Sequence, residues 1–293
     1  MSAPLAGRAD VEDAIAGICS DRASEIPEPV RSAVNYALTS GGKRLRGLLV
    51  IAAYRAAGGK GDASGLAAAV EVIHAYSLVH DDLPCMDDDD MRRGRPSTHR
   101  VFGVPAATAA GAVMIPLAAW AAHRSAVGLR LPSDACCTIV KVLMQGAGAG
   151  GMIGGQLLDL MAEGRELSRD ELDAVHAAKT GALIASSVEI GGVAAQISGP
   201  GFDAFGSYGN RIGLAFQIMD DVLDVTSSTD KLGKIAGRDA ALNKSTYPAL
   251  LGVEGAVERA NNLIDEACTD LRSQNLLSPE LEGLARFIVS RSH

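Results

Sequence analysis

Two clusters of aspartates constrain this chain more than any other feature. Residues 81–90 read DDLPCMDDDD and residues 220–224 read DDVLD, and each cluster follows an apolar stretch with helical spacing. Neighbouring carboxylates that lie against apolar helix faces repel one another and lose hydration, so a fold retains them readily where oxygen-seeking cations neutralise them. The two clusters therefore predict a helical protein in which magnesium holds a polyvalent anion between them.

The acidity of the chain is concentrated in the first cluster. The formal net charge is -8, and the stretch 81–90 contributes six acidic residues and no basic ones, so the rest of the chain carries a charge of -2. Most acidic runs are solvated surface, and that is the alternative interpretation of this stretch. The apolar and basic residues around both clusters favour a binding site instead.

The composition predicts one all-α domain over residues 1–293. Hydrophobic residues make up 47% and aromatic residues 4%, and alanine, leucine and glycine dominate, which is typical of helices. We recognise no repeat, linker or strand-like alternation, and we expect a bundle of about ten helices. Apolar recurrence predicts helices over 9–37, 45–57, 64–82, 136–160, 169–192, 202–225, 246–271 and 279–291.

Several partners and locations are disfavoured. The pI near 5.3 and the lack of a basic stripe argue against nucleic acid. Five cysteines, an odd number without metal-ligand spacing, predict a reducing, cytoplasmic location. We recognise no secretory signal in residues 1–10. Residues 101–122 are uncharged but contain glycines and prolines, so we expect a buried core helix there and no integral membrane segment.

The spacing within the clusters selects candidate metal ligands. Asp220 and Asp224 are four residues apart, which places them on one face of a helix with Gln217. Asp81 and Asp87 cannot align by helical spacing, but Pro84 between them ends the helix and lets the chain curl back around a cation. Magnesium held by few carboxylates completes its shell with water and phosphate oxygens, so the expected ligand is a phosphate ester.

Basic residues accompany the acidic clusters. Arg92 and Arg93 follow the first cluster, Lys234 follows the second, and Lys43 and Arg46 lie upstream in the segment GGKRLR. A single basic residue is more often a solvated surface charge. Together they predict a second anion site that needs no metal.

At this point the sequence resembles the trans-isoprenyl diphosphate synthases, a family also called polyprenyl synthetases, and it is most similar to the bacterial farnesyl diphosphate synthases. The order and spacing of the motifs match from about residue 41 to residue 248. The motifs are GGKRLR at 41–46, HAYSLVHDD at 74–82, RRG at 92–94, GGQ at 154–156, KTG at 179–181, FQ at 216–217 before DD at 220–221, and KSTYP at 244–248.

The resemblance implies a homodimeric all-α prenyltransferase, with helices around a deep central cavity, that joins isopentenyl diphosphate to an allylic diphosphate and releases pyrophosphate. It assigns roles residue by residue. Asp81 and Asp87 bind magnesium on one side of the allylic diphosphate and Asp220 on the other, with Asp224 in support. That diphosphate is held by Arg92, Lys179, Lys234 and Lys244, while isopentenyl diphosphate is bound by Lys43, Arg46, His74 and Arg93. Thr180 and Gln217 face the reacting carbons. The implied cofactor is Mg²⁺, three ions per active site, with Mn²⁺ as a possible substitute.

In the family that this chain resembles, product length depends on the residues five and four positions before the first cluster, which here are Tyr76 and Ser77. Tyr76 precedes Asp81 by about 7.5 Å along an ideal helix, which places it deeper in the expected cavity, where the growing tail descends. A tyrosine at this position, with two extra residues in the first cluster, resembles the farnesyl diphosphate synthases and predicts a fifteen-carbon product. A geranylgeranyl diphosphate synthase is the alternative.

The chain departs from the family pattern at four places, Gly47, Val104, Ala112 and Asn243. None of these removes an expected metal ligand. The absence of an acid at Ala112 alters the wall near the growing tail or the dimer contact, so it bears on product length and rate more than on reaction class.

Two other functions compete with this prediction. A terpene cyclase ionises the same kind of substrate, but it would not need Lys43, Arg46 and a second diphosphate site, and its second metal motif normally mixes other residues with the acid. A regulatory subunit that keeps the fold without activity should have lost acids from one cluster. Both clusters are intact here.

Overall fold

Helices account for nearly all regular structure in the computed structural model, which describes residues 7–226 and 245–291. The helices in the first half are α1 (Arg8–Asp21), η1 (Ala23–Glu25), α2 (Val30–Leu38), α3 (Leu45–Ala56), α4 (Ser64–Asp81), α5 (Thr98–Phe102), α6 (Val104–Gly128) and α7 (Ser133–Ala147). Those that follow are α8 (Met152–Met161), α9 (Arg169–His176), η2 (Ala177–Gly181), α10 (Ala182–Ala194), α11 (Pro200–Thr226), α14 (Tyr247–Ser273) and α15 (Pro279–Ser290). This confirms the predicted all-α class.

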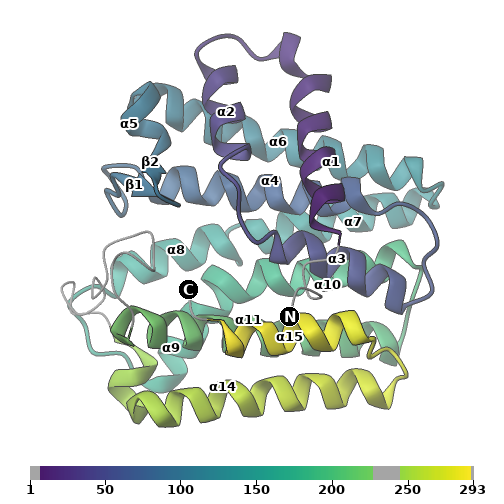
Figure 1. Ribbon diagram of the computed structural model, residues 1–293, viewed down its shortest axis with the longest axis vertical. Helices are drawn as coiled ribbons and strands as arrows, with labels where there is room; N and C mark the ends of the chain where they lie inside the picture. The colour runs from purple at the N-terminus through teal and green to yellow at the C-terminus, as the bar shows by residue number, and fades with distance from the viewer. Residues whose placement is uncertain (1–6, 227–244, 292–293) are drawn as a thin grey trace.

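The long helices lie in layers with similar directions (Figure 1). α4 packs along α6, α11 packs along α14, and α10 lies between α3, α7 and α11. α1 and α2 stand across one side of the stack. The layers bury two apolar clusters, one centred on α4 and α6 and the other on α11, α14 and α15. α3 contributes side chains to both clusters, so the two halves of the core meet at this helix.

Two predicted helices are each divided in the structure. The expected helix over 9–37 consists of α1, η1 and α2, and the one over 136–160 is split into α7 and α8 by a glycine-rich turn at 148–151. At Gly151 a Cβ would lie 2.3 Å from the carbonyl oxygen of Gly146, a contact that only glycine avoids. Apolar spacing continued across both breaks, which is why periodicity alone did not reveal them.

A short hairpin was missed by the sequence analysis. Strands β1 (Met91–Arg92) and β2 (Arg95–Pro96) pair in antiparallel register after the first aspartate cluster. Arg93 and Gly94 between them both have positive φ angles, 55° and 73°, as a tight two-residue hairpin turn requires. Strands of two residues are too short to show alternation, so the turn residues were the one available signal.

Two apolar stretches, Val104–Gly128 and Ser133–Met161, are long and apolar enough by length and composition to cross a membrane. In each, 44% of the apolar window is buried inside the fold. α6 packs against α4 and α7, and its many alanines allow close approach of these helices. A core position accounts for the composition of α6, as the sequence analysis expected.

Candidate active site

A cavity of about 440 Å³ lies at the C-terminal end of α4, between the following loop, α8, η2 and α11. Most of the predicted site residues line it: Arg46, His74, Tyr76, Ser77, Asp81, Asp87, Arg92, Lys179, Thr180, Gln217 and Asp220. Lys43, Arg93 and Asp224 are described but are not part of this lining. Lys234 and Lys244 lie outside the described residues. The two aspartate clusters, 139 positions apart in their first residues, thus contribute carboxylates to one cavity.

The first cluster curls back as the proline predicted. α4 ends at Asp81, and the backbone N–H of Asp87 donates to the carbonyl of Asp81 over 2.9 Å. Asp82 points away from the cavity lining and is almost completely buried, where it accepts a 2.9 Å hydrogen bond from Nε of Arg92. The Arg92 guanidinium also donates to Asp89 over 2.8 Å. The loop is therefore fixed by its own charges, and Arg92 is held at the cavity wall.

The electrostatics of Asp81 show that this site favours a bound cation. Burial, together with the neighbouring Asp87, raises the pKa of Asp81 to about 7, even though Lys179 and Arg92 oppose the shift. Keeping this carboxylate ionised therefore costs free energy in the metal-free protein. A divalent cation between Asp81 and Asp87 would remove that cost.

An unpaired oxygen completes the donor set. Gln156 is buried on α8, its Nε2 donates weakly to Asp87 over 3.4 Å, and its Oε1 has no hydrogen-bond partner. Carboxylate and amide oxygens are the donors that hard cations prefer. The residues present therefore fit magnesium.

The second cluster divides its carboxylates between two tasks. Asp220 is partly exposed, lines the cavity and accepts a 2.6 Å hydrogen bond from Nη2 of Arg291. Asp221 is buried and accepts from the backbone N–H of Tyr247 over 3.1 Å and from Nε2 of Gln217 over 3.0 Å. Asp221 therefore ties α11 to the start of α14 while it also forms part of the cavity lining.

Asp224 is more buried than Asp220. It is 5% exposed and does not line the cavity, although it was predicted to share a face with Asp220. Four residues advance a helix by about 6 Å and rotate it by about 40°, which is enough to carry a side chain past the rim of a small cavity. The spacing argument was too coarse to distinguish these two positions.

Lys179 and Thr180 lie in a π-helical turn, η2, inserted between α9 and α10. Such turns change the direction of side chains within a helix and are frequent at functional sites. Nζ of Lys179 donates to Asp159 over 2.7 Å, and Oγ1 of Thr180 donates to Oε1 of Gln217 over 2.9 Å. At Gly155 a Cβ would lie 2.1 Å from the backbone nitrogen of Lys179, so α8 contacts this turn directly.

Lys179 is a stable positive charge in the cavity wall. Burial alone would lower the pKa of its ammonium group, but the carboxylates of Asp159, Asp81 and Asp87 outweigh that effect and raise the pKa. The ammonium group therefore stays protonated beside the first cluster and can attract an anion.

A basic group occupies the other part of the cavity. Arg46 is 9% exposed, its Nε has no hydrogen-bond partner, and its guanidinium lies 5.9 Å from the centre of the Phe216 ring. Burial and the nearby Arg46 and Arg93 lower the pKa of His74 well below its usual value, so this imidazole is neutral. The cavity thus offers one charged and one neutral nitrogen donor at this end.

Arg93 and Lys43 flank the basic group without lining the cavity. The Arg93 guanidinium donates to the carbonyl of Gly41 and packs against Gly42, where a Cβ would lie 2.8 Å from Nη1. Lys43 lies 5.5 Å from the ring centre of Phe287. Arg44, the residue after Lys43, is buried and donates hydrogen bonds to Glu12, so it stabilises the fold instead.

Tyr76 and Ser77 both line the cavity from α4. Tyr76 is 6% exposed, and its ring meets the ring of His80 edge-to-face with centroids 4.8 Å apart. His80 in turn packs against Gly111 of α6, where a Cβ would lie 2.1 Å from Nε2. Gly111, which precedes Ala112, where the family commonly has an acid, therefore contacts a residue of the cavity wall.

Several residues at the site had no assigned role in the sequence analysis, among them Gln156, Phe216, Asp159 and Arg291. Gln156 and Phe216 stood in motifs quoted for the family resemblance, so a signal existed for both. Asp159, the partner of Lys179, lies in α8 among apolar residues, and Arg291 lies 71 residues after Asp220. The sequence gives no local indication of either pairing.

A second cavity, of about 650 Å³, lies at the opposite end of α4 and α6, beside α1. Trp120, Tyr54 and Lys60 are among its lining residues. It contains none of the predicted site residues, and the chemistry of the aspartate clusters belongs to the smaller cavity.

Comparison with known proteins agrees with this site. Residues 27–276 match the family model described as polyprenyl synthetase. The chain is 44% identical over 269 residues to farnesyl diphosphate synthase of Escherichia coli (strain K12), a match that covers 90% of both proteins. It is 40% identical over 273 residues to the chloroplastic geranylgeranyl pyrophosphate synthase 12 of Arabidopsis thaliana, covering 90% of this chain and 75% of that relative.

A solved structure extends the comparison to three dimensions. The geranyltransferase from Helicobacter pylori, complexed with magnesium and isoprenyl diphosphate, aligns with a TM-score of 0.79 and 29% identity over 98% of this chain and 97% of that chain. The family match and these relatives confirm the resemblance first suggested by the motifs. The chain therefore belongs to the polyprenyl synthetase family of prenyltransferases.

Proposed function

We propose that this short-chain trans-prenyltransferase condenses isopentenyl diphosphate with dimethylallyl or geranyl diphosphate, forms mainly farnesyl diphosphate and releases pyrophosphate. One observation carries the proposal: Asp81, Asp87 and Asp220 line the same cavity as Arg46 and the neutral His74. An acidic group and a basic group in one cavity suit two diphosphates, one bound through cations and one bound directly.

The acidic part of the cavity is assigned to the allylic diphosphate. Asp81 and Asp87 would hold magnesium on one side and Asp220 on the other, with Asp224 in support and three ions in total; Mn²⁺ could substitute. Bound magnesium supplies electrostatic stabilisation of the negative charge that develops on the leaving pyrophosphate. The fit rests on the oxygen donors described above, including the unpaired Oε1 of Gln156.

Cationic side chains share that task. Lys179 keeps its proton beside Asp81 and Asp87, and Arg92 is fixed at the wall by Asp82, so both charges are in place before substrate binds. Preorganised charges lose little free energy to reorganisation during reaction. Lys234 and Lys244 are proposed to add to this set.

The basic part is assigned to isopentenyl diphosphate. Arg46 carries an unpaired buried Nε, and Lys43 and Arg93 flank it. His74 would donate a hydrogen bond as a neutral imidazole, which adds no charge beside the arginines. Thr180 and Gln217, joined by a hydrogen bond, would face the reacting carbons. The apolar side chains that line the cavity, Leu78, Met152, Ile153 and Phe216, would help to exclude water from the allylic cation.

Farnesyl diphosphate is proposed as the main product because Tyr76 is buried in the cavity wall, where its ring would meet the growing tail. Geranylgeranyl diphosphate is the alternative, since relatives of similar identity include synthases of both products. We also propose that residues 1–293 form one domain, that the protein is a homodimer without nucleic acid as a partner, and that it acts in the cytoplasm.

Product analysis tests the proposal. Purified protein would be incubated with Mg²⁺, isopentenyl diphosphate and, in turn, dimethylallyl, geranyl or farnesyl diphosphate, and the prenyl products separated by chain length. We expect farnesyl diphosphate from the first two starters. Asp81→Asn should lower the rate by about 10²–10³, as the loss of one electrostatic contact does elsewhere. The exposed Asp13→Asn is the matched control and should retain full activity.

Each competing function has its own result in this assay. Turnover of an allylic diphosphate without isopentenyl diphosphate would indicate a terpene cyclase. Binding of magnesium and diphosphate without any product would indicate a regulatory subunit. A twenty-carbon product would keep the reaction class and replace the proposed chain length.

A further inference from the structure

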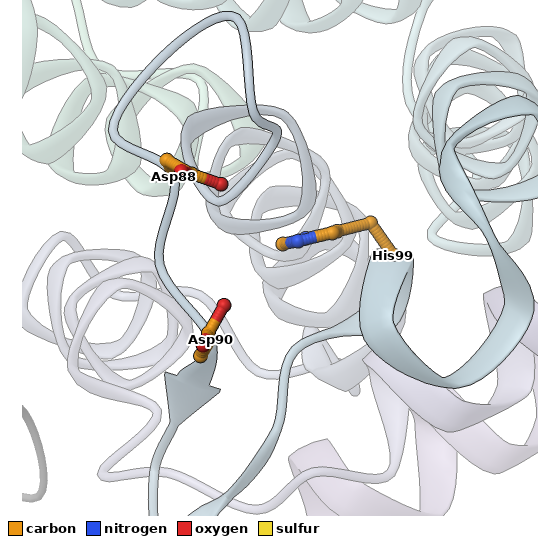
Figure 2. Close-up of side chains that lie close together, drawn as sticks. All are labelled: Asp88, Asp90 and His99. Carbon is orange, nitrogen blue, oxygen red and sulfur yellow. The ribbon is translucent and has the colours of Figure 1, made fainter.

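A second group of potential metal ligands lies outside the cavity lining, on the far side of the first aspartate loop. One carboxylate oxygen each of Asp88 and Asp90 and a ring nitrogen of His99 all lie within 4.8 Å of one another. Figure 2 shows the His99 ring extending from the start of α5 toward the space between the two carboxylates. Neither the reaction proposed above nor the family resemblance gives these three residues a role.

The histidine is the informative member of this group. His99 is 5% exposed, and its Nε2 atom is buried without any hydrogen-bond partner. A buried polar atom without a partner costs about 1–3 kcal/mol, so such atoms usually have one. The imidazole of His99 therefore lies beside two carboxylates, and its Nε2 atom forms no hydrogen bond to either of them.

The other ring nitrogen is already engaged. Nδ1 of His99 lies 3.1 Å from the hydroxyl oxygen of Ser97, which can accept a hydrogen bond from it. A histidine that donates through one nitrogen presents the lone pair of the other, and this arrangement is usual for histidines that bind metals. Ser97 is itself buried and fixed by its backbone N–H, which donates to the carbonyl of Asp90 over 2.9 Å.

The two carboxylates are accessible to a cation from solvent. Asp88 and Asp90 are both exposed, and Asp90 pairs with Arg100, whose side chain is 53% exposed. Exposed ion pairs contribute about 0–1 kcal/mol, so a divalent cation can displace Arg100 at little cost.

We propose that Asp88, Asp90 and His99 bind a divalent transition-metal cation of the Zn²⁺ type, separately from the magnesium in the cavity. One imidazole and two carboxylates suit Zn²⁺ better than Mg²⁺, which rarely takes nitrogen ligands, and water can fill the remaining position on the exposed side. The cation would fasten the loop that carries Asp87 to the start of α5. The proposal does not depend on the identity of the prenyl product.

Zinc retention in the presence of excess magnesium tests this site. The full-length protein would be equilibrated with Zn²⁺ and millimolar Mg²⁺, and bound zinc measured after dialysis. We expect wild type to retain one more zinc per chain than Asp88→Asn or His99→Gln, with zinc affinity weakened at least about tenfold in each variant. His123→Gln alters an exposed histidine on α6 and should behave as wild type. Equal zinc retention in all four proteins would overturn the proposal.

A second measurement guards against misfolding of the variants. Asp88 is exposed, so Asp88→Asn should keep the wild-type circular dichroism spectrum, and the rise in melting temperature caused by Zn²⁺ should be lost in it. Anomalous diffraction from zinc-soaked crystals would locate the ion directly. A peak beside His99 supports the proposal, and zinc found solely beside Asp81, Asp87 or Asp220 rejects it.

Discussion

The guanidinium of Arg291 donates a 2.6 Å hydrogen bond to the carboxylate of Asp220, 71 residues earlier in the chain. The same nitrogen donates to the carbonyl of Phe216 over 2.8 Å, and the guanidinium lies 3.8 Å from the centre of the Phe216 ring. The Arg291 side chain is 5% exposed, so α15 delivers a buried positive charge to a proposed metal ligand. Arg291 therefore pairs with the same carboxylate that is proposed to bind magnesium.

Removing this charge should favour metal binding. We expect Arg291→Gln to tighten Mg²⁺ binding in the absence of substrate by about two- to fivefold, since a partly exposed ion pair contributes up to about 1 kcal/mol. Isothermal titration calorimetry measures the effect. Arg286→Gln is the matched control, because Arg286 lies on α15, just before Arg291, and pairs with an acid, Asp265, away from the cavity. Unchanged or weaker Mg²⁺ binding in Arg291→Gln would contradict the competition.

The raised pKa of Asp81 predicts how stability depends on pH. Because burial raises this pKa to about 7, the folded protein binds the proton more tightly than the unfolded chain does. Asp81 therefore lowers the free energy of unfolding once its carboxyl group ionises. This effect is absent below the pKa of the unfolded chain, near 4, grows as the pH rises toward 7, and is constant above 7 at an upper limit of about 4 kcal/mol.

Replacing the carboxyl group removes this pH dependence. Metal-free Asp81→Asn should gain stability relative to wild type between pH 5 and pH 8, by on the order of 1–4 kcal/mol. Urea unfolding at both pH values measures the gain. Asp13→Asn, at an exposed position on α1, should show no such trend. A stability difference between Asp81→Asn and wild type that stays constant with pH would disprove the shift.

The burial of Tyr76 predicts a change in product length. Tyr76→Ala removes a ring that lines the cavity and contacts His80, so the tail should extend further and the products should lengthen by one isoprene unit or more. Chromatography of the reaction products measures this. Tyr36→Ala is the control, since Tyr36 packs on Phe102 outside the cavity. An unchanged product distribution in Tyr76→Ala would show that the tyrosine does not set the length.

Gly111 predicts a change in the opposite direction. In Gly111→Ala the new methyl group would meet Nε2 of His80 at 2.1 Å, so the imidazole must move, and it lies between α6 and Tyr76. Displacement toward the cavity narrows the path of the tail, and we expect a larger share of the shorter product. Gly128→Ala on the same helix meets no atom within 4 Å and serves as the control. Identical products from the two variants would exclude a role for this contact.

The sequence alone determined the helical class, the end of α4 at the first cluster and the residue types of the site. These follow from short-range effects: apolar spacing sets helical faces, and Pro84 prevents the helix from continuing through the aspartates. The breaks between α1 and α2 and between α7 and α8 were not predicted, because apolar spacing runs through them. The hairpin at 91–96 was also not predicted, because its two-residue strands are too short to show the alternation of polar and apolar residues that marks a strand.

The tertiary structure decided the surroundings and partners of each carboxylate. Asp220 and Asp221 are adjacent, chemically identical and both part of the cavity lining, but packing buries Asp221, which accepts from the start of α14, and leaves Asp220 partly exposed and paired with Arg291. A π-helical turn directs Lys179 and Thr180, and α8 supplies Asp159 and Gln156. Such pairings join segments far apart in the chain, and their free energy depends on burial and orientation, which no local sequence pattern encodes.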